Sequence, residues 1–167
     1  MPILDGERVT KHFGGLAAVS SVDFAVDQGK IVGLIGPNGA GKTTLFNLIS
    51  GALVPKDGVI RFNGQNITGL KPHRICKMGL ARTFQSVKIF PDMPALENVL
   101  LGSLFGTSNR LPAADSARAA KEALEFVGLS PLRATPAKDL TLVNQKRLEV
   151  ARALASKPEL LLLDELM

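Results

Sequence analysis

Residues 36–44 read Gly36-Pro37-Asn38-Gly39-Ala40-Gly41-Lys42-Thr43-Thr44, and this stretch decides the fold. It fits the pattern G-x-x-x-x-G-K-[ST], in which a glycine-rich loop joins a buried strand to a helix. The apolar run at residues 31–35 precedes the loop and predicts a strand that is buried on both faces. Residues 42–50 predict a helix that ends at Gly51. We therefore expect a phosphate-binding loop between a strand and a helix.

The chemistry of polyphosphates requires this order of residues. Glycines let backbone N–H groups approach phosphate oxygens without a Cβ in the way, and the helix N-terminus adds partial positive charge. Lys42 can reach the β- and γ-phosphates, and the Thr43 hydroxyl can bind Mg²⁺. The alternative is a glycine-rich turn that precedes a lysine by chance, which the flanking strand and helix disfavour. The loop thus predicts a site for a nucleoside triphosphate, ATP with Mg²⁺.

A second candidate site lies where the apolar residues 160–163 give way to Asp164 and Glu165. Ligands of α/β proteins bind at the carboxyl ends of the strands. Asp164 would hold Mg²⁺ through water, and Glu165 would polarise the attacking water. The alternative is a strand end whose two carboxylates are simply solvated, and the phosphate loop in the same chain favours the catalytic interpretation.

The rest of the pattern predicts an α/β protein with an antiparallel β flank. Alternating Val22, Phe24 and Val26 predict a half-buried strand, and Asn63-Gly64 predicts the turn of a hairpin. Pro72 begins a short helix that Gly79 ends. The other predicted elements are a strand at 80–84, a helix at 94–101, a polar loop at 102–110, helices at 113–127 and 143–155, and a strand at 160–163.

Composition limits the class of protein. The 167 residues, 46% of them hydrophobic, suffice for one domain with a core, and the net charge of +5 suits phosphates or an anionic membrane face. A nucleic-acid binder would interleave basic clusters with aromatic residues, whereas Trp and Tyr are absent. Cys76, the single cysteine, excludes an intrachain disulfide and favours a reducing compartment. The first residues show no signal-peptide pattern, and no apolar run reaches the roughly 20 residues of a membrane helix.

Four stretches of the sequence carry a resemblance to a known family. They are residues 11–19 (KHFGGLAAV), 33–47 around the loop, 79–85 (GLARTFQ) and 152–155 (RALA). In this order, and with Asp164 and Glu165 behind them, they resemble the nucleotide-binding subunits of ATP-binding cassette (ABC) transporters over the whole chain. Within that family the chain is most similar to the ATPases of branched-chain amino acid importers.

The resemblance implies the fold of a P-loop NTPase, a three-layer α/β sandwich with an antiparallel β flank and a partial helical subdomain. Residues 1–85 would form the flank, the P-loop core and the Q-loop, residues 86–147 the helical and signature region, and residues 148–167 the acidic-strand region. It also implies an ATPase on the cytoplasmic face of a prokaryotic inner membrane. Its partners would be permease subunits and a second ATPase subunit, with no nucleic acid.

Two single residues gain a role from the resemblance. Phe13 lies where the family places an aromatic side chain that stacks on adenine, and the alternative is a core phenylalanine beside a strand. Gln85 matches the Q-loop glutamine, which contacts Mg²⁺ and senses the membrane subunits. The segment 86–99 would accordingly lie near the permease.

The family's signature, Leu-Ser-Gly-Gly-Gln, is altered here to Leu140-Thr141-Leu142-Val143-Asn144. The signature opens a helix whose N-terminus faces the γ-phosphate held by the opposite subunit. Thr141 keeps the hydroxyl, but Leu142 and Val143 add side chains where backbone should approach an anion. Because the helix dipole remains, we expect a weakened or altered contact with the partner's ATP rather than none.

The chain stops at Met167, whereas family members continue with a dimer-facing D-loop and a histidine that holds the γ-phosphate. His12 and His73 both precede the two sites, so neither matches that histidine. In the family a later strand lies between the acidic strand and the P-loop strand, so the sheet would be incomplete at its C-terminal end. We expect a fragment of a longer protein that is unstable and hydrolyses ATP poorly by itself.

Two other functions stay open at the level of sequence. A soluble ABC ATPase that acts on nucleic acid or the ribosome would carry duplicated cassettes or long coiled-coil insertions, and neither is visible. Another P-loop enzyme, such as a kinase, would need a pocket for the phosphoryl acceptor, for which the sequence gives no signal. Branched-chain amino acids as cargo rest on the resemblance alone.

Overall fold

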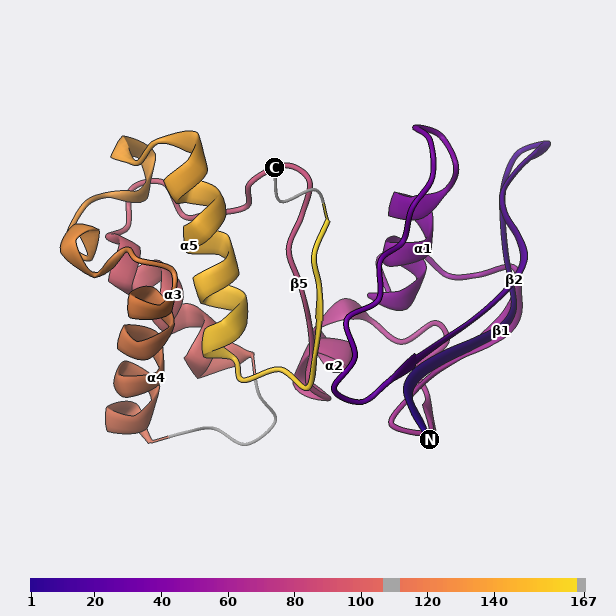
Figure 1. The fold of residues 1–167 in the computed structure, drawn as a ribbon, viewed down its shortest axis with the longest axis horizontal. Coiled ribbons are helices and arrows are strands. Elements are labelled where there is room, and N and C mark those ends of the chain that lie inside the picture. The colour runs from indigo at the N-terminus through magenta and orange to yellow at the C-terminus, as the bar shows by residue number, and fades with distance from the viewer. Residues whose placement is uncertain (107–111, 165–167) are drawn as a thin grey trace. The chain divides into compact units, whose positions relative to one another are not determined.

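The chain divides into two units, Met1–Ile75 and Cys76–Met167 (Figure 1). The computed structural model describes residues 1–106 and 112–164. Each unit has its own sheet and its own buried side chains, and each is described here by itself.

The first unit is built on a four-stranded antiparallel sheet in the order β2-β1-β3-β4. Its strands are β1 (Pro2–Phe13), β2 (Leu16–Asp27), β3 (Asp57–Phe62) and β4 (Gln65–Asn66). The alternation that predicted a strand around Val22 is confirmed by β2. The predicted Asn-Gly turn is also confirmed, because Asn63 and Gly64 both have positive φ, 50° and 71°, as the tight turn of a hairpin requires.

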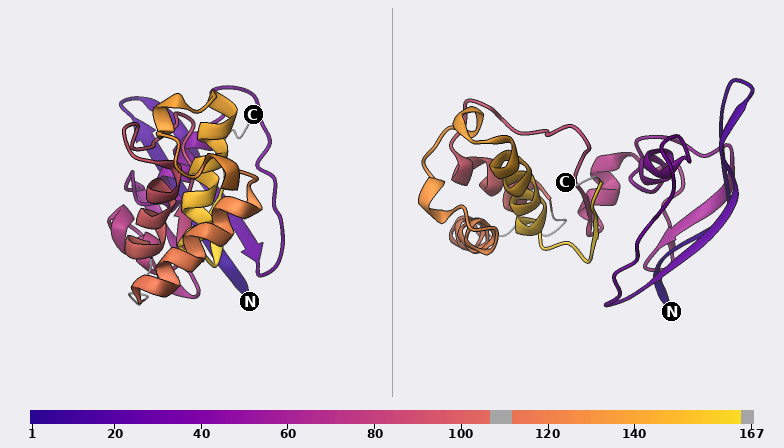
Figure 2. Two further views of the ribbon diagram at one scale, coloured as in Figure 1. Left: turned by 90° about the vertical axis from the view of Figure 1, so that its left-hand side faces the viewer. Right: turned by 45° about the horizontal axis from the view of Figure 1, so that its top comes forward.

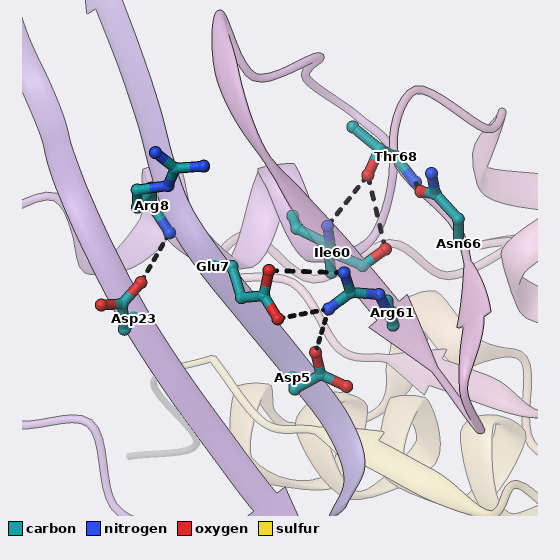
Figure 3. Close-up of polar contacts among 8 residues, drawn as sticks. All are labelled: Asp5, Glu7, Arg8, Asp23, Ile60, Arg61, Asn66 and Thr68. Atoms are coloured by element: carbon teal, nitrogen blue, oxygen red, sulfur yellow. Dashed lines mark hydrogen bonds and ion pairs between the residues drawn. The ribbon is translucent and has the colours of Figure 1, made fainter.

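The pairing of β1 with β3 is marked by an ion cluster on one face of the sheet (Figure 3). Arg61 lies directly opposite Asp5 in the register, and its Nη1 is 3.0 Å from Asp5 Oδ2 and 2.7 Å from Glu7 Oε1. The hydrogen bond from Arg61 lowers the pKa of Glu7. Because the Glu7 side chain is 60% exposed and the Arg61 side chain 33%, solvent screens the cluster, which therefore marks the register and adds little stability.

The predicted strand at residues 31–35 is not formed, and this prediction was wrong. Residues 30–37 have no regular secondary structure, and the Ile31 and Ile35 side chains are fully exposed. An apolar run forms a buried strand only where neighbouring strands supply hydrogen bonds and cover. Within residues 1–106 and 112–164, none of the strands pairs with this segment.

Helix α1 of the first unit and helix α2 at the boundary between the units agree closely with the predictions. Helix α1 (Lys42–Ile49) begins directly after the glycine loop, and Gly51 follows its C-terminus with φ 75°. Its side chains Leu45, Leu48 and Ile49 are buried. Helix α2 (Pro72–Lys77) begins at the predicted proline, and Gly79 follows it with φ 105°.

The second unit joins a short parallel sheet to three packed helices, which lie together in both views of Figure 2. Strand β5 (Leu80–Arg82) pairs with β6 (Leu160–Leu162). The helices are α3 (Ala95–Phe105), α4 (Ala113–Phe126) and α5 (Leu142–Ala155), with 3₁₀ turns at η1 (Ser130–Leu132) and η2 (Ala137–Asp139). Val99, Leu124, Leu129 and Leu148 are fully buried at the centre of this helical group.

Helix α3 runs four residues beyond the predicted end at 101, into the predicted polar loop. Tertiary packing explains the extension, because α3 crosses α5 at a glycine. A Cβ built on Gly102 would lie 2.1 Å from the Arg152 carbonyl oxygen, so only glycine permits this approach. Of the predicted loop, residues 107–110 lie outside the described residues. Among the described residues, no helix combines the length and the apolar character needed to cross a bilayer.

Candidate nucleotide-binding site

The glycine loop leaves the N-terminus of α1 without a side-chain cap. Gly41 is the N-cap residue with φ 89°, and its carbonyl accepts the first helical hydrogen bond from Leu45 N–H at 2.8 Å. No side chain of α1 caps its first turn, and that turn holds no acidic residue. Its N–H groups and the partial positive charge of the helix are therefore available to an anion.

Gly41 is required by a contact as well as by its backbone angle. A Cβ built on it would lie 2.2 Å from the carbonyl oxygen of Ala18 in β2. At Gly39, which also has positive φ (82°), a Cβ would meet nothing within 4 Å. The loop therefore packs directly against β2 at Gly41, whereas at Gly39 there is open space around the backbone.

Lys42 lies back across its own loop. Its Nζ donates to the carbonyl oxygens of Gly36 at 2.6 Å and Pro37 at 2.9 Å. Both acceptors are neutral, and an ammonium bonds more strongly to charged oxygens. The same short reach can therefore transfer the ammonium to phosphate oxygens that occupy the loop.

The other predicted residues of this unit lie close to the loop in sequence or at a strand end. Thr43 and Thr44 are partly buried in the first turn of α1. Phe13 ends β1 with 49% of its surface exposed, so it does not belong to the buried core. Lys11 Nζ lies 5.7 Å from the centre of its ring.

In the second unit Asp164 forms a buried ion pair that sequence reasoning missed. Its Oδ2 is 3.0 Å from Nη2 of Arg82 on β5, and both side chains are less than a tenth exposed. The Asp164 N–H donates to Thr83 Oγ1 at 3.2 Å. The alternative of a solvated strand end therefore does not describe Asp164. Glu165 lies outside the described residues.

The predicted signature residues open helix α5. Thr141 is the N-cap residue, and its Oγ1 accepts a hydrogen bond from Asn144 N–H at 3.3 Å. The Leu142 and Val143 side chains are 63% and 61% exposed. With Phe126 and Arg147 they line an open groove of about 780 Å³. Where the family presents glycine backbone, this chain presents apolar side chains to solvent.

The segment that carries Gln85 is held by a buried carboxylate on α5, which the sequence did not indicate. Gln85 itself is exposed, and Glu149 is 3% exposed. Glu149 Oε1 accepts a hydrogen bond from Lys88 N–H at 3.3 Å. Burial raises the pKa of Glu149, while the backbone N–H groups of Lys88 and Phe84 and the charge of Arg152 oppose that rise. The sequence of an amphipathic helix predicts that its glutamates face solvent, so the burial of Glu149 could not be predicted from it.

The oxygen donors of the predicted metal set suit Mg²⁺. They are the Thr43 hydroxyl, the Gln85 amide oxygen and the Asp164 carboxylate, all of them hard ligands. Across residues 1–106 and 112–164 there is no group of three or more His, Cys, Asp or Glu that could hold a metal ion. Mg²⁺ commonly takes most of its ligands from water and substrate phosphates, so a protein needs to supply only a few oxygen donors.

Comparison with known proteins gives concordant matches. Residues 19–167 match the family described as "ABC transporter". The chain is 40% identical to the high-affinity branched-chain amino acid transport ATP-binding protein BraF of Pseudomonas aeruginosa, over 98% of this chain and 69% of that protein. It is 38% identical to LivG of Escherichia coli, which has the same description, with the same shares covered.

Solved structures agree with this match. The ADP conformation of MJ1267, an ATP-binding cassette of an ABC transporter, superposes with a TM-score of 0.87 at 34% identity, covering all of this chain and 70% of that one. The dimeric cassette MJ0796 bound to ADP and Pi gives a TM-score of 0.87 at 26% identity, with 98% and 74% covered. The predicted P-loop fold with an antiparallel β subdomain and helices is confirmed by these similarities.

Proposed function

Because the chain belongs to the ABC transporter family of ATPases, we propose that it is the ATP-binding and ATP-hydrolysing part of an importer for branched-chain amino acids. The glycine loop carries the first half of this proposal, since Lys42 and the uncapped N-terminus of α1 offer an anion site. The similarity to BraF and LivG over nearly the whole chain supports the choice of cargo.

Binding of ATP follows from the first unit. The N–H groups of residues 36–44 would surround the phosphates, and Lys42 would move from the Gly36 and Pro37 carbonyls to the β- and γ-phosphate oxygens. Phe13, half-exposed at the end of β1, would stack on the adenine ring. The expected result is a nucleotide held at its base and at its phosphates.

The residues proposed for hydrolysis are those that the sequence assigns to Mg²⁺ and to the attacking water. Thr43, Gln85 and Asp164 would hold Mg²⁺, which neutralises the developing phosphate charge when bound. Glu165 would polarise the attacking water. Arg82 would hold the Asp164 carboxylate in position, because the two side chains form a buried ion pair.

The partners follow from the family. MJ0796 forms a dimeric cassette, and we propose that this chain likewise pairs with a second ATPase subunit, with residues 141–144 facing the ATP of that subunit. Residues 86–99 would lie near the permease subunits, at the cytoplasmic face of a prokaryotic inner membrane.

Isolation of the protein with its natural partners tests the proposal. We expect the complete protein, extracted in mild detergent, to retain membrane subunits with many spans, and its Mg²⁺-dependent ATPase to rise when a branched-chain amino acid and its binding protein are supplied. Omitting the amino acid is the control. Recovery with RNA or ribosomes in place of membrane subunits would refute the importer and favour a soluble ABC ATPase.

The altered signature gives a second test. Replacing Leu142 and Val143 together by Gly should raise the ATPase rate of the complete protein several-fold, because backbone N–H groups could then approach the partner's γ-phosphate. Both side chains are largely exposed, so their loss removes little packing. The double Ala variant is the matched control, since it removes bulk but keeps Cβ atoms. An unchanged rate in the Gly variant would show that the substitutions do not weaken the site.

A further inference from the structure

Glu149 and Arg152 on α5 form hydrogen bonds with the backbone just beyond Gln85, an arrangement that we call the grip. Glu149 and Arg152 are three residues apart, so both project from the same side of the helix. Glu149 Oε1 accepts from Lys88 N–H at 3.3 Å, and Arg152 Nη2 donates to the Lys88 carbonyl oxygen. One helix thus satisfies both backbone groups of a residue that lies outside any strand.

The grip extends to both sides of Gln85. The carboxylate of Glu149 also takes a backbone hydrogen bond from Phe84. Arg152 lies against the Phe90 ring, with its guanidinium carbon 5.9 Å from the ring centre. Residues 84–90 are therefore attached to α5 at both ends of the segment that bears Gln85.

The two gripping side chains also depend on each other. Arg152 Nη2 lies 3.9 Å from Glu149 Oε1, and the Glu149 and Arg152 side chains are 4% and 20% exposed. A charge buried to this degree is costly unless it is paired and hydrogen-bonded, so the contacts with Lys88 are part of what stabilises the pair. Without the contacts to Lys88, both charged side chains would be poorly solvated. Loss of one contact therefore destabilises the other, and we expect the two to break together.

The same helix begins with Thr141, which caps its N-terminus 8 residues before Glu149. The backbone hydrogen bonds of α5 run without interruption from its first turn to Glu149 and Arg152, so these residues belong to one helical element. A shift of α5 at its N-terminus would hence move residues 84–90, and the reverse holds as well.

We infer that Glu149 and Arg152 are positioning residues, which make the segment carrying Gln85 and the signature helix α5 move as one body. The inference rests on the roles proposed above for Gln85 and residues 141–144. It assigns to a buried glutamate and a partly buried arginine the task of linking the nucleotide of one subunit, contacted through Gln85, to that of the other.

The test combines amide exchange with kinetics in the complete protein. In Glu149→Ala we expect hydrogen exchange of the Phe84 and Lys88 amides to accelerate at least tenfold. We also expect kcat for ATP to fall at least tenfold with KM changed less than threefold, because the glycine loop is untouched. Glu149→Gln keeps an acceptor of the same length and should stay within about threefold of the unaltered protein in both measurements. Glu125→Ala, at an exposed position of α4, is the control and should change neither.

Two results would overturn the inference. One is faster exchange in Glu149→Ala with kcat within twofold of normal, because the contact would then be structural only. The other is unchanged exchange, because the grip would then not exist. If Glu149→Ala fails to fold, Arg152→Met is judged by the same criteria; it removes the bond to the Lys88 carbonyl oxygen and the charge beside Glu149 and Phe90, while it keeps the apolar part of the side chain. An unaltered protein without any Mg²⁺-dependent ATPase would instead refute the proposed function, while the exchange of the two amides would still report on the grip.

Discussion

Replacing Lys42 by Ala is expected to lower the affinity for Mg²⁺-ATP at least about 100-fold and to abolish measurable hydrolysis. The ammonium would make two or more hydrogen bonds to charged phosphate oxygens, each contributing about 1.5–3 kcal/mol, and each 1.4 kcal/mol is tenfold in affinity. Its only bonds in this structure within the described residues are to Gly36 and Pro37 of its own loop. The fold should therefore survive the change.

Nucleotide titration by calorimetry, with circular dichroism to confirm folding, measures the effect. Lys30→Ala removes the same charge from an exposed position near the start of the loop and should leave the affinity within threefold. If Lys42→Ala also retained its affinity within threefold, the loop would not be the phosphate site. The proposals for Thr43 and Asp164 as Mg²⁺ ligands would then lose their premise.

Local signals in the sequence were sufficient wherever neighbouring residues determine the conformation. Pro72 begins a helix and Gly51 and Gly79 follow helix ends as expected, and Asn63-Gly64 forms the hairpin turn, because each acts through its own backbone angles. The glycine loop could also be predicted, since the glycines that allow positive φ angles and the residues of the helix that follows are adjacent in the sequence.

The failures concern features that depend on distant parts of the chain. Residues 31–35 have strand composition, but a strand also needs partners, and composition does not say whether they are present. The extension of α3 through Gly102 depends on the backbone of α5, about 50 residues later in the sequence. Arg82 and Glu149 are charged residues whose burial results from the pairing of β5 with β6 and the packing of α5, so their sequence neighbours give no sign of it.

Gly41→Ala should be the most destabilising substitution in the glycine loop. Its φ of 89° lies in the left-handed region, which costs an L-residue about 1–2 kcal/mol. The added Cβ would also lie 2.2 Å from the Ala18 carbonyl oxygen, and relief by shifting backbone in a packed region costs about 1–3 kcal/mol more. We expect a loss of about 2–5 kcal/mol in the free energy of unfolding, measured by urea denaturation, together with weaker nucleotide binding.

Gly39→Ala separates the two causes of that loss. Gly39 has nearly the same backbone angle, φ 82°, but a Cβ there would meet nothing within 4 Å. The backbone term alone should therefore apply, and the loss should stay near 1–2 kcal/mol. Equal losses in the two variants would mean that the contact between Gly41 and β2 contributes nothing. A larger loss at Gly41 would show that the antiparallel sheet fixes the position of the phosphate loop, so that a change in β2 must also change the affinity for nucleotide.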